Sequence, residues 1–395
     1  MPDVYEESLV LHEKTRGKIE IRSKVELKTK NDLSLAYTPG VAAVSREIAK
    51  NPKKVYNYTM KSNSVAVLSD GSAVLGLGNI GPEAALPVME GKAALFKEFG
   101  GIDAIPICLK TQDPDEIVKI AKNIAPVFGG INLEDISAPR CFEIEEQLQD
   151  IGIPVMHDDQ HGTAITILAA LINACKAADK RLEDLSIVIS GAGAAGTATA
   201  KLLLCLGYDR NVCTPVKEIV VCDSKGIIYE GRGNLEKNKN ELAALTNKKK
   251  LQGNLEKAVE GKDVFIGLST GNILTKDMVR KMVDKPIIFA MANPVPEIMP
   301  HDAAEAGAFI IGTGRSDMSN QINNALAFPG VFRGALDAKA TRINNLMKIA
   351  AAYALASCIA PSREKIVPDV LDKSVHKKVA EAVRKAAINS SDVRA

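Results

Sequence analysis

Short apolar runs rich in valine and isoleucine recur along the chain, separated by segments with helical periodicity. Such runs are typical of strands buried in a parallel sheet, whose faces are covered by the intervening helices. The pattern therefore predicts an α/β fold. The predicted strands are residues 65–68, 73–77, 104–108, 132–136, 153–156, 185–190, 218–222, 264–268, 287–290 and 308–312.

Turn residues refine this pattern. Asp70-Gly71 separates the first two apolar runs, and Asp-Gly is a strong tight-turn signal, so we expect an antiparallel hairpin there. Helices are expected over residues 82–99, after Asp113-Pro114, and over residues 139–149, 163–178 and 197–206. The Lys- and Asn-rich residues 234–253 are typical of a solvated surface excursion, and the chain after Ala335 reads as helices without strands.

This pattern divides the chain into three parts. Residues 1–160 form an N-terminal α/β domain, which we expect to carry the substrate site. Residues 161–330 form a second α/β domain with a doubly wound sheet. Residues 331–395 form a helical segment that packs on the other two parts.

Composition narrows the class of protein. The 395 residues include 50 Lys+Arg and 48 Asp+Glu, a net charge of +2, which gives no reason to expect nucleic acid or a membrane surface as partner. Aromatic residues make up 4% and Trp is absent, so a platform for stacking bases is not expected. The longest apolar stretches, residues 165–175 and 349–361, are shorter than the ~18 residues of a membrane span.

The N-terminus and the cysteines indicate the cellular compartment in which we expect the protein. The N-terminus is charged and has no apolar signal core. The seven cysteines are dispersed and include no CxxC pair, so we expect reduced, packed thiols, with neither a disulfide nor a thiolate metal site. Together these features predict a cytoplasmic protein. The cysteines are Cys108, Cys141, Cys175, Cys205, Cys213, Cys222 and Cys358.

Two GxGxxG motifs are present and only the second has the context of a dinucleotide loop. It comprises Gly191, Gly193, Ala194, Ala195 and Gly196, follows a predicted strand and precedes a predicted helix. This context predicts a Rossmann-type domain that binds NAD or NADP. The first motif, with Gly76, Gly78, Asn79 and Gly81, follows the predicted hairpin and is read as a glycine loop that lets a ligand approach the backbone.

Asp223 ends the strand after the second motif, where an acidic residue accepts hydrogen bonds from the ribose diol. The gap to it exceeds the usual ~20 residues, which the polar insert 208–217 explains. Asp223 would repel the 2′-phosphate of NADP, whereas Ser224 and Lys225 could bind it. Both cofactors stay open, and we favour NAD.

Two acidic pairs stand at predicted strand ends: Glu134-Asp135 and Asp158-Asp159. Single pairs are usually solvated loop residues, but strand ends of one parallel sheet converge on a cleft. Clustered carboxylates there suit Mg²⁺ or Mn²⁺. The spacing of His157 and His161 resembles a zinc-protease motif, but no Glu follows His157, so we expect these histidines to form hydrogen bonds in a loop.

Other polar residues have ordinary interpretations when taken singly. Lys92 lies on a predicted helix, where a lysine usually faces solvent, and Tyr37 is typical of a packed loop tyrosine. Asn293 ends a strand, where its amide could bind a substrate carboxylate or the nicotinamide; Asn323 and Asn324 could do the same, and the alternative for each is a turn-stabilising Asn.

The combination of these segments is specific. From about Tyr37 to Gly330 the chain contains, in order, LAYTPGVA, SDGSAVLGLGNIGPEAALPVMEGKAALFKEFGGIDAIPI, LEDISAPRCFEIE, HDDQHGTA, GAGAAG, MANPVPE and GTGRSDMSNQINNALAFPG. In these segments it resembles the short prokaryotic-type malic enzymes. The resemblance implies oxidative decarboxylation of (S)-malate to pyruvate and CO₂ with reduction of NAD⁺ or NADP⁺, a divalent metal, and at least a homodimer. Oxaloacetate decarboxylation or a malolactic-type reaction at the same site is the alternative.

The resemblance also implies roles for individual residues. Lys92 matches the family's general base and Tyr37 its general acid, while Asp158 is expected to contact Lys92. Glu134, Asp135 and Asp159 match the metal ligands. Gly191–Gly196 contact the cofactor phosphates, and Gly76, Gly78, Asn79, Gly81, Asp223 and Asn293 border the cofactor. Lys92, Asn293, Asn323 and Asn324 reach the substrate. The residue that pairs with the second malate carboxylate stays open.

Overall fold

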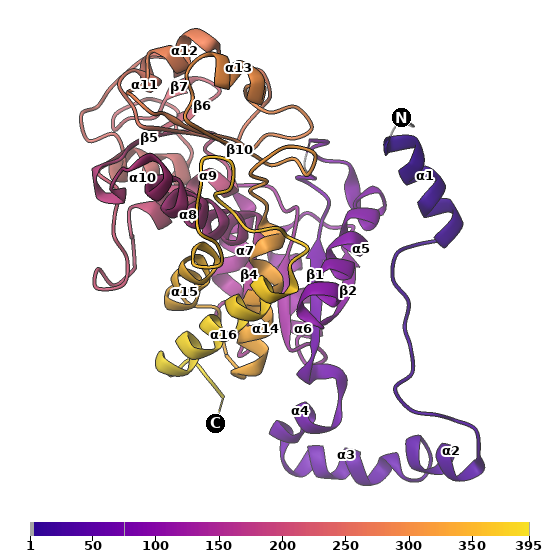
Figure 1. Cartoon of the computed structure of the whole chain (residues 1–395). Helices are drawn as coiled ribbons and strands as arrows, with labels where there is room; N and C mark the ends of the chain where they lie inside the picture. The colour runs from indigo at the N-terminus through magenta and orange to yellow at the C-terminus, as the bar shows by residue number, and fades with distance from the viewer. Residues whose placement is uncertain (1–3, 75, 395) are drawn as a thin grey trace.

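The first sheet lies in the N-terminal part of the chain and is entirely parallel (Figure 1). The structure, a computed structural model, describes residues 4–74 and 76–394. The strand order is β2-β1-β3-β4. Every residue of β1 is buried, as expected for a strand with neighbours on both edges and helices on both faces. The strands are β1 (Ser64–Ser69), β2 (Asp103–Cys108), β3 (Gly130–Leu133) and β4 (Val155–His157).

Helices cover both faces of this sheet. Leu68 shares a buried cluster with Ile117 and Ile144 on one face, whereas Val67 shares a cluster with Phe96 on the other. This alternation along β1 follows from the two-residue period of a strand. The helices are α5 (Gly81–Gly100), α6 (Pro114–Ile124) and α7 (Arg140–Leu148).

The predicted hairpin between residues 65–68 and 73–77 is wrong. β1 pairs with β2 on one edge and β3 on the other, so no edge remains for a second, antiparallel strand. The chain instead turns at Gly71, with φ of 65°, and Val74 pairs with Gly78 in an isolated bridge. Residue 75, within the predicted strand, lies outside the described residues.

The second sheet has the order β10-β9-β8-β5-β6-β7 and is parallel except for β7, which runs antiparallel to β6. β5 is the first strand of this sheet in the sequence; β6 pairs with one of its edges, and β8 pairs with the other. This doubly wound order confirms the predicted Rossmann-type architecture and places its switch point between β5 and β8. The strands are β5 (Ser186–Ser190), β6 (Glu218–Asp223), β7 (Gly226–Ile227), β8 (Val264–Gly267), β9 (Ile287–Ala290) and β10 (Ile310–Thr313).

Helices of the second sheet include one that the sequence pattern missed. The prediction that residues 234–253 are a solvated excursion is wrong in part, because α10 lies there and buries Leu242 and Ala243. Two apolar residues on one turn are enough to pack a short helix against the core, but they are too few to show the 3.6-residue hydrophobic period of a helix. The helices are α9 (Ala194–Leu203), α10 (Lys237–Leu245), α11 (Leu255–Val259), α12 (Lys276–Arg280) and α13 (Pro300–Glu305).

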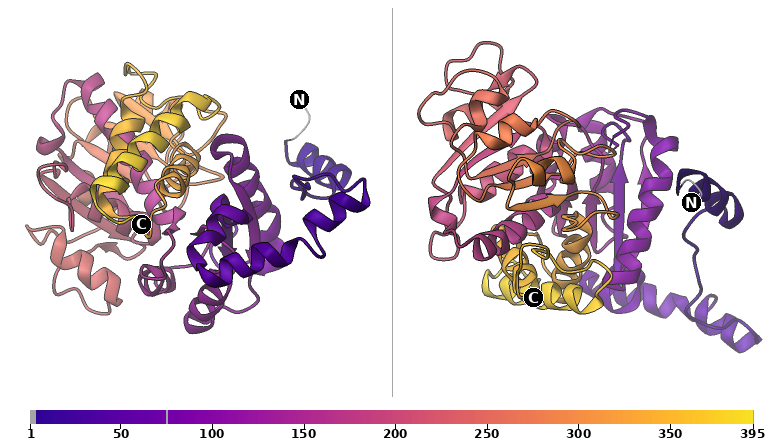
Figure 2. Two further views of the ribbon diagram at one scale, coloured as in Figure 1. Left: turned by 90° about the horizontal axis from the view of Figure 1, so that it is seen from below. Right: turned by 45° about the horizontal axis from the view of Figure 1, so that its top comes forward.

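The long helix α8 (Asp158–Ala178) leads from the first sheet to the second. It is long and apolar enough to cross a membrane, but 72% of its most apolar window is buried inside the protein, as in a core helix. The predicted helical tail is confirmed: α14 (Phe328–Asp337), α15 (Asn345–Ala356) and α16 (Lys373–Asn389) pack together, with α15 against α8 (Figure 2).

Residues 4–58, here called the arm, extend away from the two sheets (Figures 1 and 2). The arm contains α1 (Val4–Thr15), α2 (Lys30–Ala36), α3 (Val41–Lys50) and α4 (Val55–Tyr58), and none of these helices buries a residue. It nevertheless exposes large apolar side chains, among them Leu9, Ile21 and Leu35. Lys18 ties it to α5 by donating from Nζ to the Pro87 carbonyl at 2.6 Å.

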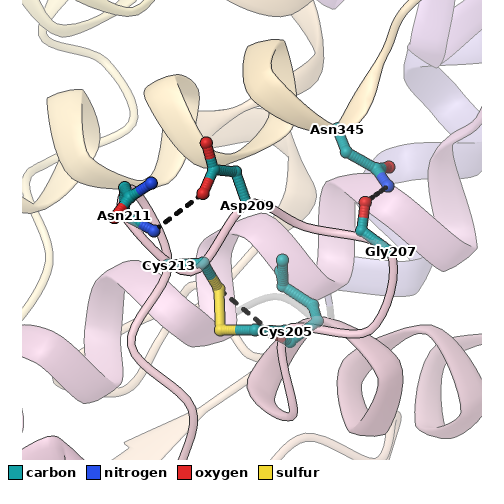
Figure 3. The surroundings of a disulfide bond; sticks show 7 residues. Cys205, Gly207, Asp209, Asn211, Cys213 and Asn345 are labelled. Carbon is teal, nitrogen blue, oxygen red and sulfur yellow. Dashed lines mark hydrogen bonds between the residues drawn. A yellow bond between two sulfur atoms is a disulfide. The ribbon is translucent and has the colours of Figure 1, made fainter.

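The prediction that all seven cysteines are free thiols is wrong for two of them. Cys205 and Cys213 form a disulfide, with their Cα atoms 5.8 Å apart (Figure 3). After α9 the chain reverses at Cys205, whose φ is 54°, and returns through a turn in which the Cys213 amide donates to the Asp209 carbonyl. This reversal brings together two residues that have no characteristic spacing. The other five cysteines are free.

Candidate active site

A cavity of about 640 Å³ lies where the carboxyl ends of strands from the two sheets face one another. This is the position expected for ligands of open α/β folds. It brings together residues that the sequence placed in separate motifs. The lining includes Gly76, Asp135, Ser137, Asp159, Thr163, Gly193, Ala194, Ala195, Ser269, Asn293, Gly314, Asn323 and Asn324.

Three carboxylates from neighbouring strand ends converge at one side of the cavity. Glu134 and Asp135 follow β3, and Asp159 lies in the first turn of α8, directly after β4. One ligand atom from each lies within 4.8 Å of the others. Asp135 has φ of 53°, and its amide donates to Asp159 Oδ2 at 2.9 Å, which fixes the two residues relative to each other.

The electrostatics of this group fit a divalent cation. Burial, reinforced by the charge of Asp159, raises the pKa of Asp135 to about 8, and burial also raises the pKa of Glu134 well above its ordinary value. Asp135 Oδ2 is buried with no hydrogen-bond partner among the described residues. A hard cation would satisfy that oxygen and stabilise the ionised carboxylates, which are the ligands that Mg²⁺ and Mn²⁺ prefer. The donor set therefore fits the predicted metal.

Lys92 is buried beside this group rather than exposed to solvent. Its Nζ lies 2.7 Å from Asp158 Oδ2, 2.8 Å from Glu134 Oε1 and 4.3 Å from the ring centroid of Phe328. Burial lowers the pKa of Lys92, but Asp158, Glu134 and Asp159 outweigh burial and raise it. Without a cation the lysine is thus protonated. The expected contact between Lys92 and Asp158 is present.

Glu145 of α7 anchors the turn between β4 and α8. It is buried, and it accepts hydrogen bonds from the His157 amide at 2.9 Å and from the Gln160 side chain at 3.1 Å. Its Oε2 also lies 2.9 Å from His161 Nε2. Burial opposes ionisation, but His161 and the hydrogen bonds lower the pKa of Glu145 to about 2.

His161 therefore supports this turn through its ring, as a hydrogen-bonding histidine, whereas both ring nitrogens of His157 are buried without a hydrogen-bond partner among the described residues. The expectation that they belong to a loop is wrong, because His157 ends β4 and His161 lies in α8, which begins at Asp158 and not at residue 163. Glu145 gave no signal in the sequence, because a single Glu on an amphipathic helix is normally solvated.

The second glycine loop is shaped as predicted. A Cβ on Gly191, whose φ is 117°, would lie 2.3 Å from the Leu268 carbonyl oxygen, and one on Gly196 would lie 1.8 Å from the Gly191 carbonyl oxygen. Gly193, in contrast, has no atom within 4 Å of such a Cβ and faces the cavity. This open surface at the start of α9 suits a pyrophosphate. The helix begins at Ala194, earlier than the predicted residue 197.

Asp223 ends β6, as predicted, and its carboxylate forms a hydrogen bond and two ion pairs within the protein. Oδ1 accepts from the Lys225 amide at 2.9 Å, and Oδ2 lies 2.6 Å from Arg232 and 3.6 Å from Lys239. Burial raises the pKa of Asp223, but Arg232 outweighs it and the pKa is lowered. The carboxylate is therefore ionised at the end of β6.

The first glycine loop contributes less than predicted. Gly76 lines the cavity, and a Cβ there would lie 2.9 Å from the Asn293 carbonyl oxygen. Gly78, Asn79 and Gly81 are not among the lining residues: Asn79 exchanges side-chain hydrogen bonds with Gln112, and Gly81 begins α5. The loop therefore borders the cavity at one residue.

The asparagines occupy the cavity as predicted, but Tyr37 does not. Asn293, Asn323 and Asn324 all line it, and Asn323 Oδ1 also accepts from the Ala325 amide. Tyr37 ends α2 on the arm and is 67% exposed. Figure 1 shows α2 away from both sheets, and Tyr37 is not among the residues that line the cavity.

Ser137, Thr163 and Ser269 also line the cavity and were not predicted. Hydroxyl residues in loops are too common for sequence spacing to single them out. No Lys or Arg is among the described lining residues, which leaves amides and hydroxyls to meet a second substrate carboxylate.

Comparisons with known proteins agree with this geometry. Residues 16–149 match the family model of the malic enzyme N-terminal domain, and residues 160–388 match that of the malic enzyme NAD-binding domain. The bifunctional malic/malolactic enzyme of Bacillus subtilis is 56% identical over 394 residues, covering 98% of this chain and 94% of the relative. The NAD-dependent malic enzyme of Geobacillus stearothermophilus is 53% identical over 382 residues, covering 96% of this chain and 78% of the relative.

Solved structures give the same result. The NAD-dependent malic enzyme of Thermotoga maritima is 50% identical with a TM-score of 0.91, covering 95% of this chain and 98% of that one. The malic enzyme of Pyrococcus horikoshii is 46% identical with a TM-score of 0.93, covering 99% and 92%. Two domain matches that together span most of the chain, with relatives above half identity, establish that this chain belongs to the malic enzyme family.

Proposed function

We propose that the protein catalyses the oxidative decarboxylation of (S)-malate to pyruvate and CO₂, with reduction of NAD⁺ or NADP⁺. One observation carries the proposal: Asp135 and Asp159 line one cavity together with the dinucleotide-binding glycine loop, at Gly193–Ala195. The third converging carboxylate, Glu134, contacts the buried Lys92 beside that cavity. Oxidation of a 2-hydroxy acid followed by loss of CO₂ needs a base, a Lewis acid and a hydride acceptor within one enclosed site.

Glu134, Asp135 and Asp159 would hold the divalent cation. When bound, Mg²⁺ or Mn²⁺ supplies Lewis acidity for the C2 oxygen and offsets the carboxylate charge that keeps Lys92 protonated. The glycine loop would hold the nicotinamide cofactor, which accepts the hydride from C2.

Lys92 would act as the general base for the C2 hydroxyl. Its Nζ is held between Asp158 and Glu134 and lies over the Phe328 ring, and these contacts fix the position of the amine. A lysine serves as a base at neutral pH only when its pKa is depressed. Burial supplies that depression once the negative charge around Lys92 is compensated.

Asn293, Asn323 and Asn324 would orient the substrate and the nicotinamide. Their side chains line the same cavity as Asp135 and Asp159, and an amide can donate to a carboxylate without adding charge. They are the polar groups that would meet the carboxylate of malate that does not reach the cation.

Asp223 supports NAD as the preferred cofactor. Its ionised carboxylate stands at the end of β6, where it can accept hydrogen bonds from a ribose diol and would repel a 2′-phosphate. Arg232 and Lys239 are already paired with it. Steady-state kinetics with each cofactor should give the higher kcat/KM with NAD⁺.

We propose that the protein works as a homodimer in which Tyr37 serves the site of the other copy. The arm exposes apolar side chains and buries none of its helix residues, so it needs a partner to cover it. Tyr37 would then supply the proton for C3 of enolpyruvate, although it does not line the cavity of its own chain.

The decisive experiment measures malate-dependent formation of NADH or NADPH. The purified protein should turn over with Mn²⁺ and stop after treatment with EDTA. Lys92→Ala should lower kcat by about 10²–10⁴-fold, the range for loss of a general base, while cofactor binding is retained. Turnover that survives chelation, or a wild-type rate in the variant, contradicts the proposal.

A malolactic reaction is the second candidate, because the Bacillus subtilis relative carries that activity in its name. Such a reaction would use the same cavity and return the hydride to pyruvate before release, giving lactate without net cofactor reduction. Measuring lactate and reduced cofactor in the same reaction separates the two: one equivalent of NADH per malate indicates the malic activity alone.

A further inference from the structure

A second cavity, of about 310 Å³, lies at the base of the arm, where the C-terminal tail meets it. It shares no lining residue with the candidate active site. Four of its lining side chains are cationic and none is acidic. The lining residues are Asn51, Lys53, Lys54, Tyr56, Asn57, Lys339 and Arg394.

Arg394 is held in place at this cavity. Its guanidinium stacks on the Tyr56 ring, 4.0 Å from the centroid, and Nη1 donates to Tyr56 Oη at 2.5 Å and to the Gly152 carbonyl at 3.2 Å. Its amide donates to the Lys339 carbonyl at 2.9 Å. Among the described residues no carboxylate lies within ion-pair distance of it, and its Nε is buried without a partner. The arginine is thus pre-organised, and residues 4–74 and 76–394 supply no counter-ion for it.

Lys53 and Lys339 both line the cavity, and they come from the arm and from the turn after α14. Lys53 lies on the short helix that follows Asn51, and Lys339 has φ of 53° at the turn after α14. In the described part of the chain neither ammonium has a carboxylate within 4.0 Å, whereas Lys54 pairs with Glu47 at 2.5 Å. The cluster therefore carries a net positive charge.

A further cation, Lys61, lies close to this positively charged cluster. Lys61 contacts the lining residue Tyr56, with Nζ 5.3 Å from the ring centroid, and donates to the carbonyls of Ala125 and Phe128. Burial, together with the charge of Arg394, lowers the pKa of Lys61 to about 8. Two cations on one aromatic ring are unfavourable unless an anion lies nearby.

We propose that this cavity binds a small metabolite with two or more negative charges, carried by phosphate or carboxylate groups. Its volume is at the low end of ligand sites, about 300–1,000 Å³, which suits a compact anion and excludes a polymer. A planar guanidinium with two flanking ammonium groups is suited to the charge-assisted hydrogen bonds of such oxygens. The bound anion would join the base of the arm to the C-terminal tail.

Calorimetric titration of the full-length protein with pyrophosphate and, separately, tricarballylate tests the proposal. The titration is made without divalent metal and with saturating NAD⁺, so that the probes do not report the glycine loop or chelation. We expect one site per chain for at least one probe. Preference for pyrophosphate assigns a phosphate ligand, and preference for tricarballylate assigns a carboxylate ligand.

The double variant Lys53→Gln/Lys339→Gln should weaken binding at least tenfold. The matched control, Lys119→Gln/Lys248→Gln, removes two lysines that have no ion pair in the described residues and should bind as the unmodified protein does. Equal melting temperatures exclude unfolding as the cause. Absence of binding by both probes, or equal binding by the double variant, overturns the proposal. The titration involves no turnover, so its result is independent of the proposed function.

Discussion

Lys92 and its four acidic neighbours place more negative than positive charge in a buried volume. Glu134, Asp135, Asp158 and Asp159 oppose a single ammonium, and burial together with this excess of negative charge raises the pKa values of Glu134 and Asp135. A site that holds protons where a cation belongs must release them when the cation binds. Proton release is therefore a direct measure of whether these residues are the ligands.

The apparent affinity for Mn²⁺ should increase as the pH rises from 6 to about 8 and then level off. Below the pKa of about 8 for Asp135 the metal must displace a proton, and above it the carboxylate is already ionised. Calorimetry in two buffers of different ionisation enthalpy gives the number of protons released. An affinity that does not change with pH contradicts the assignment.

Glu145 is expected to contribute to stability in a way that depends on pH. Its folded pKa of about 2 lies below the unfolded value of 4.5, so its contribution is complete above pH 4.5 and is lost as the pH falls toward 2. Glu145→Gln should cost about 3 kcal/mol at pH 7, because it removes the buried negative charge that faces His161 and Lys348, and should reduce the acid sensitivity.

Urea unfolding between about pH 2 and pH 7 checks this prediction, because that range includes the interval in which the contribution is lost. Glu146→Gln, on the exposed side of the same helix, is the matched control and should change the free energy of unfolding by less than ~0.5 kcal/mol. The Glu145 variant should also bind Mn²⁺ more weakly, since it loosens the turn that carries Asp159. If neither Glu145→Gln nor Glu146→Gln changed the free energy of unfolding, Glu145 would not anchor the turn between β4 and α8.

Among single residues, the sequence correctly predicted the clustering of those whose positions follow from the order of strands in the sheet. Glu134, Asp135 and Asp159 come together because the strands before them are adjacent and parallel. Glu145 and Lys92 required knowledge of which helix face is buried, and the family resemblance alone indicated Lys92. Tyr37 could not be placed, because the arm has no core of its own to define where it lies.

The strand, glycine loop and helix that would hold the cofactor are formed by short-range steric constraints. Gly191 and Gly196 allow the chain to pass within contact distance of Leu268 and of itself. These constraints are local, which is why the motif could be read from sequence. The hairpin prediction failed because strand pairing is a long-range property: Asp70-Gly71 does form a tight turn, but both edges of β1 are already paired.

Gly196→Ala should lower the affinity for NAD⁺ at least tenfold and destabilise the protein by about 2 kcal/mol. The added methyl group would lie 1.8 Å from the Gly191 carbonyl oxygen, so the loop must open. Fluorescence titration with NADH and thermal unfolding measure the two effects. Gly233→Ala, in an exposed loop with no atom within 4 Å of the new Cβ, is the control, and a variant indistinguishable from it would contradict the packing argument.

For the whole molecule, the main division is between two packed sheets and an arm that packs on neither. The doubly wound order and the helical tail were predicted, because both follow from the alternation of apolar segments. The arm and the disulfide between Cys205 and Cys213 were not, because exposed apolar side chains and a chain reversal leave no periodic signal.

Mixing two inactive variants tests whether the arm acts across copies. Tyr37→Phe and Lys92→Ala should each be inactive alone. Exchange of subunits should restore up to about a quarter of wild-type activity, because half of the dimers are then hybrids and each hybrid has one intact site. Mixtures that stay inactive after refolding together, with both variants dimeric by sedimentation, would show that Tyr37 acts within its own chain or not at all.

An arm without buried residues has a consequence for how the enzyme responds to dilution. A site that needs a tyrosine from a neighbouring molecule is assembled by a bimolecular event, so its abundance follows mass action. Specific activity should then fall as the protein is diluted below the dissociation constant of the pair, and ligands that favour association should raise it. The rate per milligram would thus report how much protein is present as well as how well each molecule works.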